Sequence, residues 1–191
     1  MNDTLMVIGE ALIDFIPTEQ GMALKDVCSF TKHCGGAPIN IAAATAKLGA
    51  HSKVLTQVGA DAFGDFILET LSLCQVDITA VKRTKQYPTA LAFVALDEKG
   101  NRDFTFYRDP CADLHLSAED ITATMFQDCG ILHFCSVDLV DSPMKQAHLK
   151  AIQLAKEQGA IISFDPNVRL PLWSSKEDCK NTILEFAPYA D

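Results

Sequence analysis

The sequence predicts an α/β fold built on a mostly parallel sheet. Short apolar runs alternate along the chain with segments of helical periodicity, which is the pattern of repeated strand–helix units. The apolar runs lie at residues 5–9, 53–59, 130–135 and 160–164. A strand–turn–strand pattern at residues 89–108 interrupts this alternation, and a parallel sheet does not require such a hairpin. We therefore expect a second, antiparallel piece of sheet, which is a candidate lid.

The composition of the chain limits the kinds of binding partner and the cellular compartment that we expect. The 191 residues are 48% apolar, enough for a real core, and carry a net charge of −9. Such a charge argues against a nucleic-acid backbone or an anionic membrane as the main partner. Neither the seven cysteines nor the five histidines have the spacing of a disulfide framework or a metal site. With no basic leader and no spanning apolar run, we expect a cytoplasmic protein without a metal site.

The first predicted strand, residues 5–9, ends at Gly9. A dinucleotide-binding turn would need Gly-x-Gly-x-x-Gly here, and the sequence does not supply it, which disfavours an oxidoreductase. Asp14 follows as a single carboxylate among apolar residues. Open α/β sheets bind ligands at the carboxyl ends of their strands, so Asp14 is a candidate binding residue. The alternative is a surface residue on an alternating strand.

A glycine-led turn opens the first helix. Gly35 and Gly36 let the backbone approach another group closely, and the helix continues to a stop at Gly49. Because position 37 is Ala, no side-chain oxygen caps the helix, and we expect its first N–H groups to face water or a ligand. Asn40 lies in the first turn, on the same side. A plain loop before a buried helix is the alternative.

The remaining elements follow from periodicity and capping signals. Further helices are predicted at residues 61–74, 117–126, 142–158 and 176–186. Weaker strand patterns lie at residues 27–31 and 78–81.

Two further groups of polar residues are candidates for a site. Asp165, Asn167 and Arg169 follow the last predicted strand, and together they could bind a polyol or an anionic oxygen. A turn that satisfies its own polar groups is the alternative. Arg108 ends the hairpin, and two interpretations are open: it contacts a ligand, or it is a charged residue exposed to solvent.

Over nearly its whole length the chain resembles the PfkB (ribokinase-like) family of carbohydrate kinases. The motifs that carry the resemblance are Gly9-Glu10-x-x-x-Asp14, Gly35-Gly36-Ala37-Pro38-x-Asn40-x-Ala42, Val58-Gly59-x-Asp61-x-x-Gly64 and Phe106-Tyr107-Arg108 followed by Ala112-Asp113. The segment Asp165-Pro166-Asn167-x-Arg169-x-x-Leu172-Trp173 is similar to the fructokinase and 2-keto-3-deoxygluconate kinase branch.

The resemblance implies a doubly wound ribokinase-like domain whose β-sheet lid comes from about residues 14–34 and 88–108, with residues 1–191 forming its N-terminal, substrate-binding part. It implies phosphoryl transfer from ATP with Mg²⁺ to a sugar hydroxyl, with K⁺ as a further candidate cofactor. Arg169 would stabilise the negative charge that develops during phosphoryl transfer. The resemblance also implies a homodimer formed through the lid. The implied sugar-binding residues are Asp14, Gly35, Gly36, Asn40, Phe106, Arg108, Asp165, Asn167 and Arg169.

One departure from the family pattern affects the expected activity. The family's Gly-Ala-Gly-Asp motif, which supplies the general base, has no counterpart between Trp173 and Asp191. We therefore expect a chain truncated before the ATP-binding half and inactive by itself. Fructokinase is the first expectation for the complete enzyme, because Phe106 offers no hydroxyl to an acid sugar. The alternatives are 2-keto-3-deoxygluconate kinase and a non-catalytic sugar-binding module.

Overall fold

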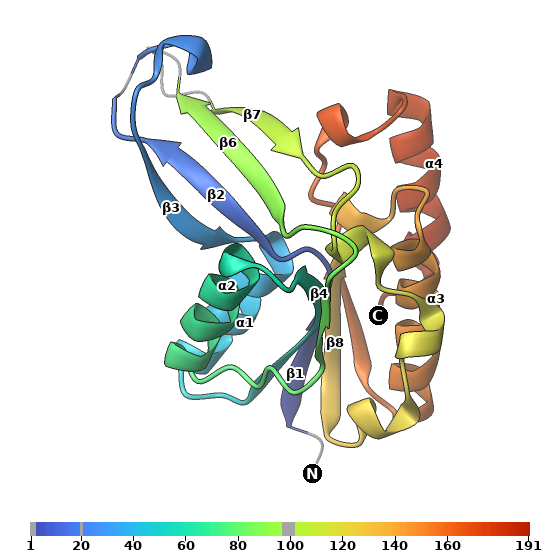
Figure 1. The fold of residues 1–191 in the computed structure, drawn as a ribbon. Helices are drawn as coiled ribbons and strands as arrows, with labels where there is room; N and C mark the ends of the chain where they lie inside the picture. The colour runs from blue at the N-terminus through green and yellow to red at the C-terminus, as the bar shows by residue number, and fades with distance from the viewer. Residues whose placement is uncertain (1–2, 20, 97–101) are drawn as a thin grey trace.

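The strands of the protein form two sheets (Figure 1). The computed structural model describes residues 3–19, 21–96 and 102–191. The main sheet is five-stranded, in the order β5-β4-β1-β8-β9, and all of its paired strands are parallel. Its strands are β1 (Thr4–Ile8), β4 (Ser52–Gly59), β5 (Val81–Thr84), β8 (Cys129–Cys135) and β9 (Ile161–Asp165). The predicted α/β class is confirmed.

Helices cover both faces of the main sheet. The helices are α1 (Ala37–Lys47), α2 (Ala62–Leu73), α3 (Pro143–Glu157) and α4 (Lys176–Phe186). In Figure 1, α1 and α2 lie on one side of the sheet and α3 and α4 on the other. The central strand β1 is buried on both of its faces. Val7 packs among the buried apolar residues on the α1 side of the sheet, whereas Met6 and Ile8 pack among those on the α3 side. Alternate residues of β1 are thus buried on both faces, as doubly wound sheets require.

The small sheet, as we call the second one, has four strands in the order β3-β2-β6-β7. Its strands are β2 (Leu12–Pro17), β3 (Phe30–Gly35), β6 (Ala90–Leu96) and β7 (Arg102–Tyr107). The antiparallel β6–β7 hairpin is confirmed, and its predicted turn at residues 97–101 lies outside the described residues. Asp14 stands within β2, opposite His33 and Ala92, so it belongs to a strand of the small sheet.

Aromatic packing attaches the small sheet to the main domain. Phe15 of β2 stacks on Phe93 of β6, with ring centroids 4.8 Å apart. Phe63 of α2 meets Phe15 edge-on, with ring centroids 5.8 Å apart. This cluster fixes the base of the small sheet above the carboxyl ends of the parallel strands (Figure 1).

Two predicted elements differ from the structure. The helix expected at residues 117–126 is replaced by two 3₁₀ turns, Ala118–Asp120 and Ala123–Phe126. The capping contact is present, since the Ser117 amide donates to Asp120 at 3.1 Å, but the following Ile121 and Thr122 are β-branched and disfavour a continuous helix. The weak strand expected at residues 78–81 begins later, as β5.

Within the part of the chain that the structure describes, every helix is too short or too polar to cross a bilayer.

Candidate functional site

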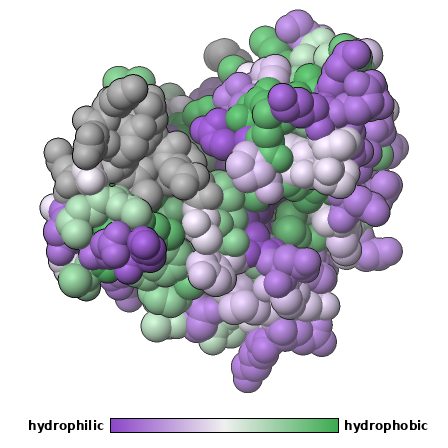
Figure 2. Space-filling model, turned by 90° about the horizontal axis from the view of Figure 1, so that it is seen from above, coloured by the Kyte–Doolittle hydropathy of each residue, from purple (hydrophilic) through white to green (hydrophobic). Residues whose placement is uncertain are grey.

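A pocket of about 160 Å³ opens at the carboxyl ends of the parallel strands, beneath the small sheet. Seen from that side, the surface is hollowed between the small sheet and the loops opposite, with hydrophilic residues in the hollow (Figure 2). The lining residues are Glu10, Leu12, Asp14, Gly36, Ala37, Asn40, Phe106, Val137, Asn167 and Arg169.

The topology explains why distant residues share this pocket. Ala92 of β6 pairs with Asp14 of β2 on one side and with Phe106 of β7 on the other, so the three side chains point to one face of the small sheet. Asn167 and Arg169 reach the pocket from the segment that follows β9. The structure therefore brings together six predicted site residues: Asp14, Gly36, Asn40, Phe106, Asn167 and Arg169.

The two glycines of the turn are needed for different reasons. Gly36 has a φ of +114°, and a Cβ there would lie 2.2 Å from the carbonyl oxygen of Glu10. A Cβ on Gly35 would lie 2.3 Å from Oδ2 of Asp14. Gly36 thus allows the strand–helix turn, while Gly35, which does not line the pocket, leaves room for the Asp14 carboxylate.

The start of α1 corrects one expectation. The helix has no side-chain cap, as predicted, although its N-cap is Gly36 and Ala37 is its first residue, and the Ala37 amide donates to Oε1 of Glu10 at 2.7 Å. The prediction that this N–H faces water or a ligand is wrong, because a carboxyl from the end of β1 reaches across to accept it. Sequence reasoning missed Glu10, although a carboxylate directly after a strand is the same signal that drew attention to Asp14.

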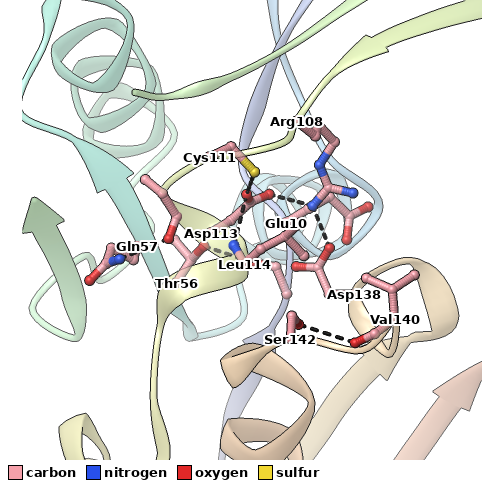
Figure 3. A network of polar contacts seen from close by, with 12 residues as sticks. Glu10, Thr56, Gln57, Arg108, Cys111, Asp113, Leu114, Asp138, Val140 and Ser142 are labelled. Atoms are coloured by element: carbon pink, nitrogen blue, oxygen red, sulfur yellow. Dashed lines mark hydrogen bonds and ion pairs between the residues drawn. The ribbon is translucent and has the colours of Figure 1, made fainter. Parts of the chain in front are cut away.

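Arg108 and Asp165 lie outside the pocket. The Arg108 guanidinium is buried, and its Nη2 donates to Asp113 at 2.6 Å and to Asp138 at 2.5 Å (Figure 3). Asp165 accepts the Asn167 amide at 2.9 Å and so holds the turn after β9. Neither side chain lines the pocket, although Asp165 contacts Asn167, which does.

Burial shapes the electrostatics behind the pocket. It raises the pKa of Asp138 well above the usual range, although the neighbouring Arg108 acts to lower it. Burial likewise raises the pKa of Glu10, again against the lowering effect of Arg108. The Cys111 thiol donates to Asp113 at 2.7 Å. Several acids thus surround one guanidinium in a water-poor interior (Figure 3).

The donor set of the pocket suits a small polyol. Besides Glu10, which bonds the Ala37 amide, one carboxylate, two amides and a guanidinium can hydrogen-bond hydroxyl groups from several directions, and Phe106 offers an apolar ring. Among the residues that the structure describes, no group of three His, Cys, Asp or Glu side chains could hold a metal ion.

Comparison with known proteins places the chain in a family. Residues 2–191 match the model of the pfkB family carbohydrate kinases. The probable fructokinase-2 of Arabidopsis thaliana is 40% identical over 183 residues, which is 96% of this chain and 56% of that protein.

Solved structures agree with this match. A fructokinase with bound ATP from Xylella fastidiosa superimposes with a TM-score of 0.90 at 35% identity, covering 100% of this chain and 60% of that one. A sugar kinase from Pyrococcus horikoshii in complex with ATP gives a TM-score of 0.91 at 35% identity, covering 98% of this chain and 61% of that one. The chain thus spans somewhat more than half the length of these relatives, and it belongs to the PfkB family of carbohydrate kinases.

Proposed function

We propose that this chain is the sugar-binding part of an ATP-dependent sugar kinase, with fructose as the sugar. The observation that carries the proposal is the convergence of Asp14, Asn40 and Arg169 on one pocket beneath the small sheet. Asp14 and Asn40 would hold hydroxyl groups, and the Gly36 turn would let the backbone approach the sugar closely. The relatives named fructokinase support fructose over other sugars.

Arg169 is the residue of this chain that we assign to the transfer step. Its side chain is exposed at the pocket, and its Nη1 donates to the Val168 carbonyl at 3.0 Å, which helps to orient the guanidinium. From there it can stabilise negative charge that develops near the accepting hydroxyl. ATP, when bound with Mg²⁺, supplies the phosphoryl group, and K⁺ is a further candidate activator. The family assigns the general base to a Gly-Ala-Gly-Asp motif without a counterpart in residues 1–191, so the proposal concerns a complete kinase that contains this sequence.

The small sheet would serve as a lid over the sugar. It supplies Asp14 and Phe106 to the pocket, and a sugar beneath it would be shielded from water that competes as an acceptor. Its outer strands β3 and β7 are edges that a second subunit could cover, which supports a homodimer through the lid. The seven cysteines are free thiols, as suits the cytoplasm.

A second candidate substrate is 2-keto-3-deoxygluconate. Arg169 could pair with its carboxylate, but Phe106 offers no hydroxyl there, which favours the neutral sugar. A non-catalytic sugar-binding module would use the same pocket without transferring phosphate.

Initial rates separate these functions. A complete kinase that contains residues 1–191 should phosphorylate fructose with a higher kcat/KM than 2-keto-3-deoxygluconate, in an assay coupled to ADP release. A preference for the acid would reverse the assignment. Sugar binding by calorimetry without turnover would favour the non-catalytic module, and no binding of either sugar would refute the proposed function.

A further inference from the structure

Glu10 is a buried carboxyl at the bottom of the pocket, and the functions assigned above do not use it. It directly follows β1, its side chain is only 3% exposed, and it lines the same pocket as Asp14 and Asn40. A buried carboxyl is costly to keep unless it makes specific contacts, so its partners indicate its role.

The contacts of Glu10 join separate elements. Oε1 accepts the Ala37 amide at 2.7 Å, in the first turn of α1. Oε2 accepts the thiol of Cys135, the last residue of β8, at 3.4 Å. Its backbone carbonyl lies where a Cβ on Gly36 would stand, 2.2 Å away. Glu10 therefore touches the glycine turn through both its main chain and its side chain.

The charges around Glu10 indicate that hydrogen bonding, not ion pairing, is its main contribution. The Arg108 guanidinium lies close by, but its Nη2 already bonds Asp113 and Asp138 (Figure 3). Burial raises the pKa of Glu10, and Asp113 adds a smaller raising effect, although Arg108 acts to lower it, so a negative charge on Glu10 is disfavoured in this interior. A carboxyl oxygen accepts the Ala37 N–H whether or not the other oxygen carries a proton.

We propose that Glu10 is a positioning residue for sugar recognition, a role that rests on the proposed function of the pocket. By accepting the Ala37 N–H, it fixes the first turn of α1 against the end of β1. That turn carries Gly36 and Asn40, which line the pocket, so their placement depends on a side chain that need not touch the sugar.

The test compares Glu10→Met, which has a similar length but no acceptor oxygen, with Glu10→Gln, which keeps one. In a complete kinase that contains residues 1–191, Glu10→Met should raise the KM for fructose about tenfold or more, because a buried hydrogen bond is lost. Glu10→Gln should stay within about threefold of the parent, and the KM for ATP should not change in either variant. Glu69→Ala, at an exposed position on α2, is the matched control and should change neither constant.

Amide hydrogen exchange gives a readout that does not depend on activity. In the sugar-free chain, exchange at Ala37 should be slow in the parent and in Glu10→Gln, and about tenfold faster or more in Glu10→Met. If Glu10→Met does not fold, Glu10→Gln is sufficient for the test. Fast exchange of the Ala37 amide in Glu10→Gln would then overturn the proposal. So would equal KM changes in the two variants, or a matching rise in the KM for ATP. If the parent enzyme does not phosphorylate fructose but the Ala37 amide exchanges as expected in all three proteins, the proposed function is wrong and the contact of Glu10 with the turn is still supported.

Discussion

At the scale of single residues, Asp14 is the carboxylate that we propose to hold a sugar hydroxyl. It is half-buried on β2, and the missing side chain of Gly35 leaves room for it. Asp14→Asn should weaken fructose binding by about 2 kcal/mol, or roughly 30-fold in Kd, because a hydrogen bond to a charged acceptor is lost. Calorimetry measures this, with Asp26→Asn on an exposed turn as the control. An unchanged Kd would remove Asp14 from the site.

Arg108 is the residue whose loss should cost the most stability. Asp113 and Asp138, both fully buried, lie within 2.6 Å of its Nη2. Arg108→Met should lower the free energy of unfolding by about 3–5 kcal/mol, because two buried carboxyls lose their cation. Urea denaturation measures the change. Asp138→Asn should cost less, since its carboxyl already has a raised pKa, and the opposite order would contradict this account.

His148 should make stability depend on pH. Burial in α3 lowers its pKa to about 4, so between roughly pH 6.5 and 4 the unfolded chain binds the proton more readily and stability falls as the pH falls. From pH 7 to pH 5 the chain should lose about 2 kcal/mol more than a His148→Phe variant, as measured by urea denaturation at both pH values. Equal losses in the two proteins would show that His148 is not the source.

At the scale of elements, we propose that the turn between β3 and α1 links the backbone conformation at Gly36 to sugar recognition. Gly36→Ala would place a Cβ at a φ of +114° and against the Glu10 carbonyl, whereas Gly49→Ala has a φ of +89° and nothing within 4 Å. Both variants should lose stability through backbone strain, of about 1–3 kcal/mol. Fructose affinity measured by calorimetry should fall only in Gly36→Ala. Normal affinity in that variant would separate the turn from sugar recognition.

Regular elements were predictable from local pattern. The last helix, Lys176–Phe186, begins after the cap Ser175, whose side chain accepts the Asp178 amide as the capping rules anticipate. Strands such as β8 are short apolar runs between polar turns. The helix expected at residues 117–126 fails where the β-branched Ile121 and Thr122 follow the capped turn, and the two 3₁₀ turns that replace it bury Ile121 and Phe126 in the core, which local sequence does not reveal.

The sequence identified many of the polar residues of the site, but it did not predict which of them contact one another. Asn40 lies at the start of a helix and Arg169 follows a strand, as expected, whereas Asp14 lies within β2, and the structure brings all three to one pocket. Arg108 could not be placed from sequence, because its partner Asp138 lies 30 positions away in a segment without a regular pattern. Glu10 directly follows a strand, which is a local signal, but its bond to Ala37 spans 27 positions, so its partner could not be predicted from local sequence.

At the scale of the whole molecule, the pocket depends on both sheets. The main sheet contributes the segments after β1, β8 and β9, and the small sheet contributes Asp14 and Phe106 from above. Neither sheet alone encloses the hollow seen in Figure 2. The arrangement of the two sheets is therefore the central structural claim of the proposed sugar site.

A crystal structure of a complete kinase that contains residues 1–191, determined with bound fructose, tests that claim most directly. We expect fructose between the two sheets, with hydroxyl groups within about 3.2 Å of the Asp14 carboxylate and the Asn40 amide. Fructose bound elsewhere, with both of these side chains facing solvent, would contradict the account.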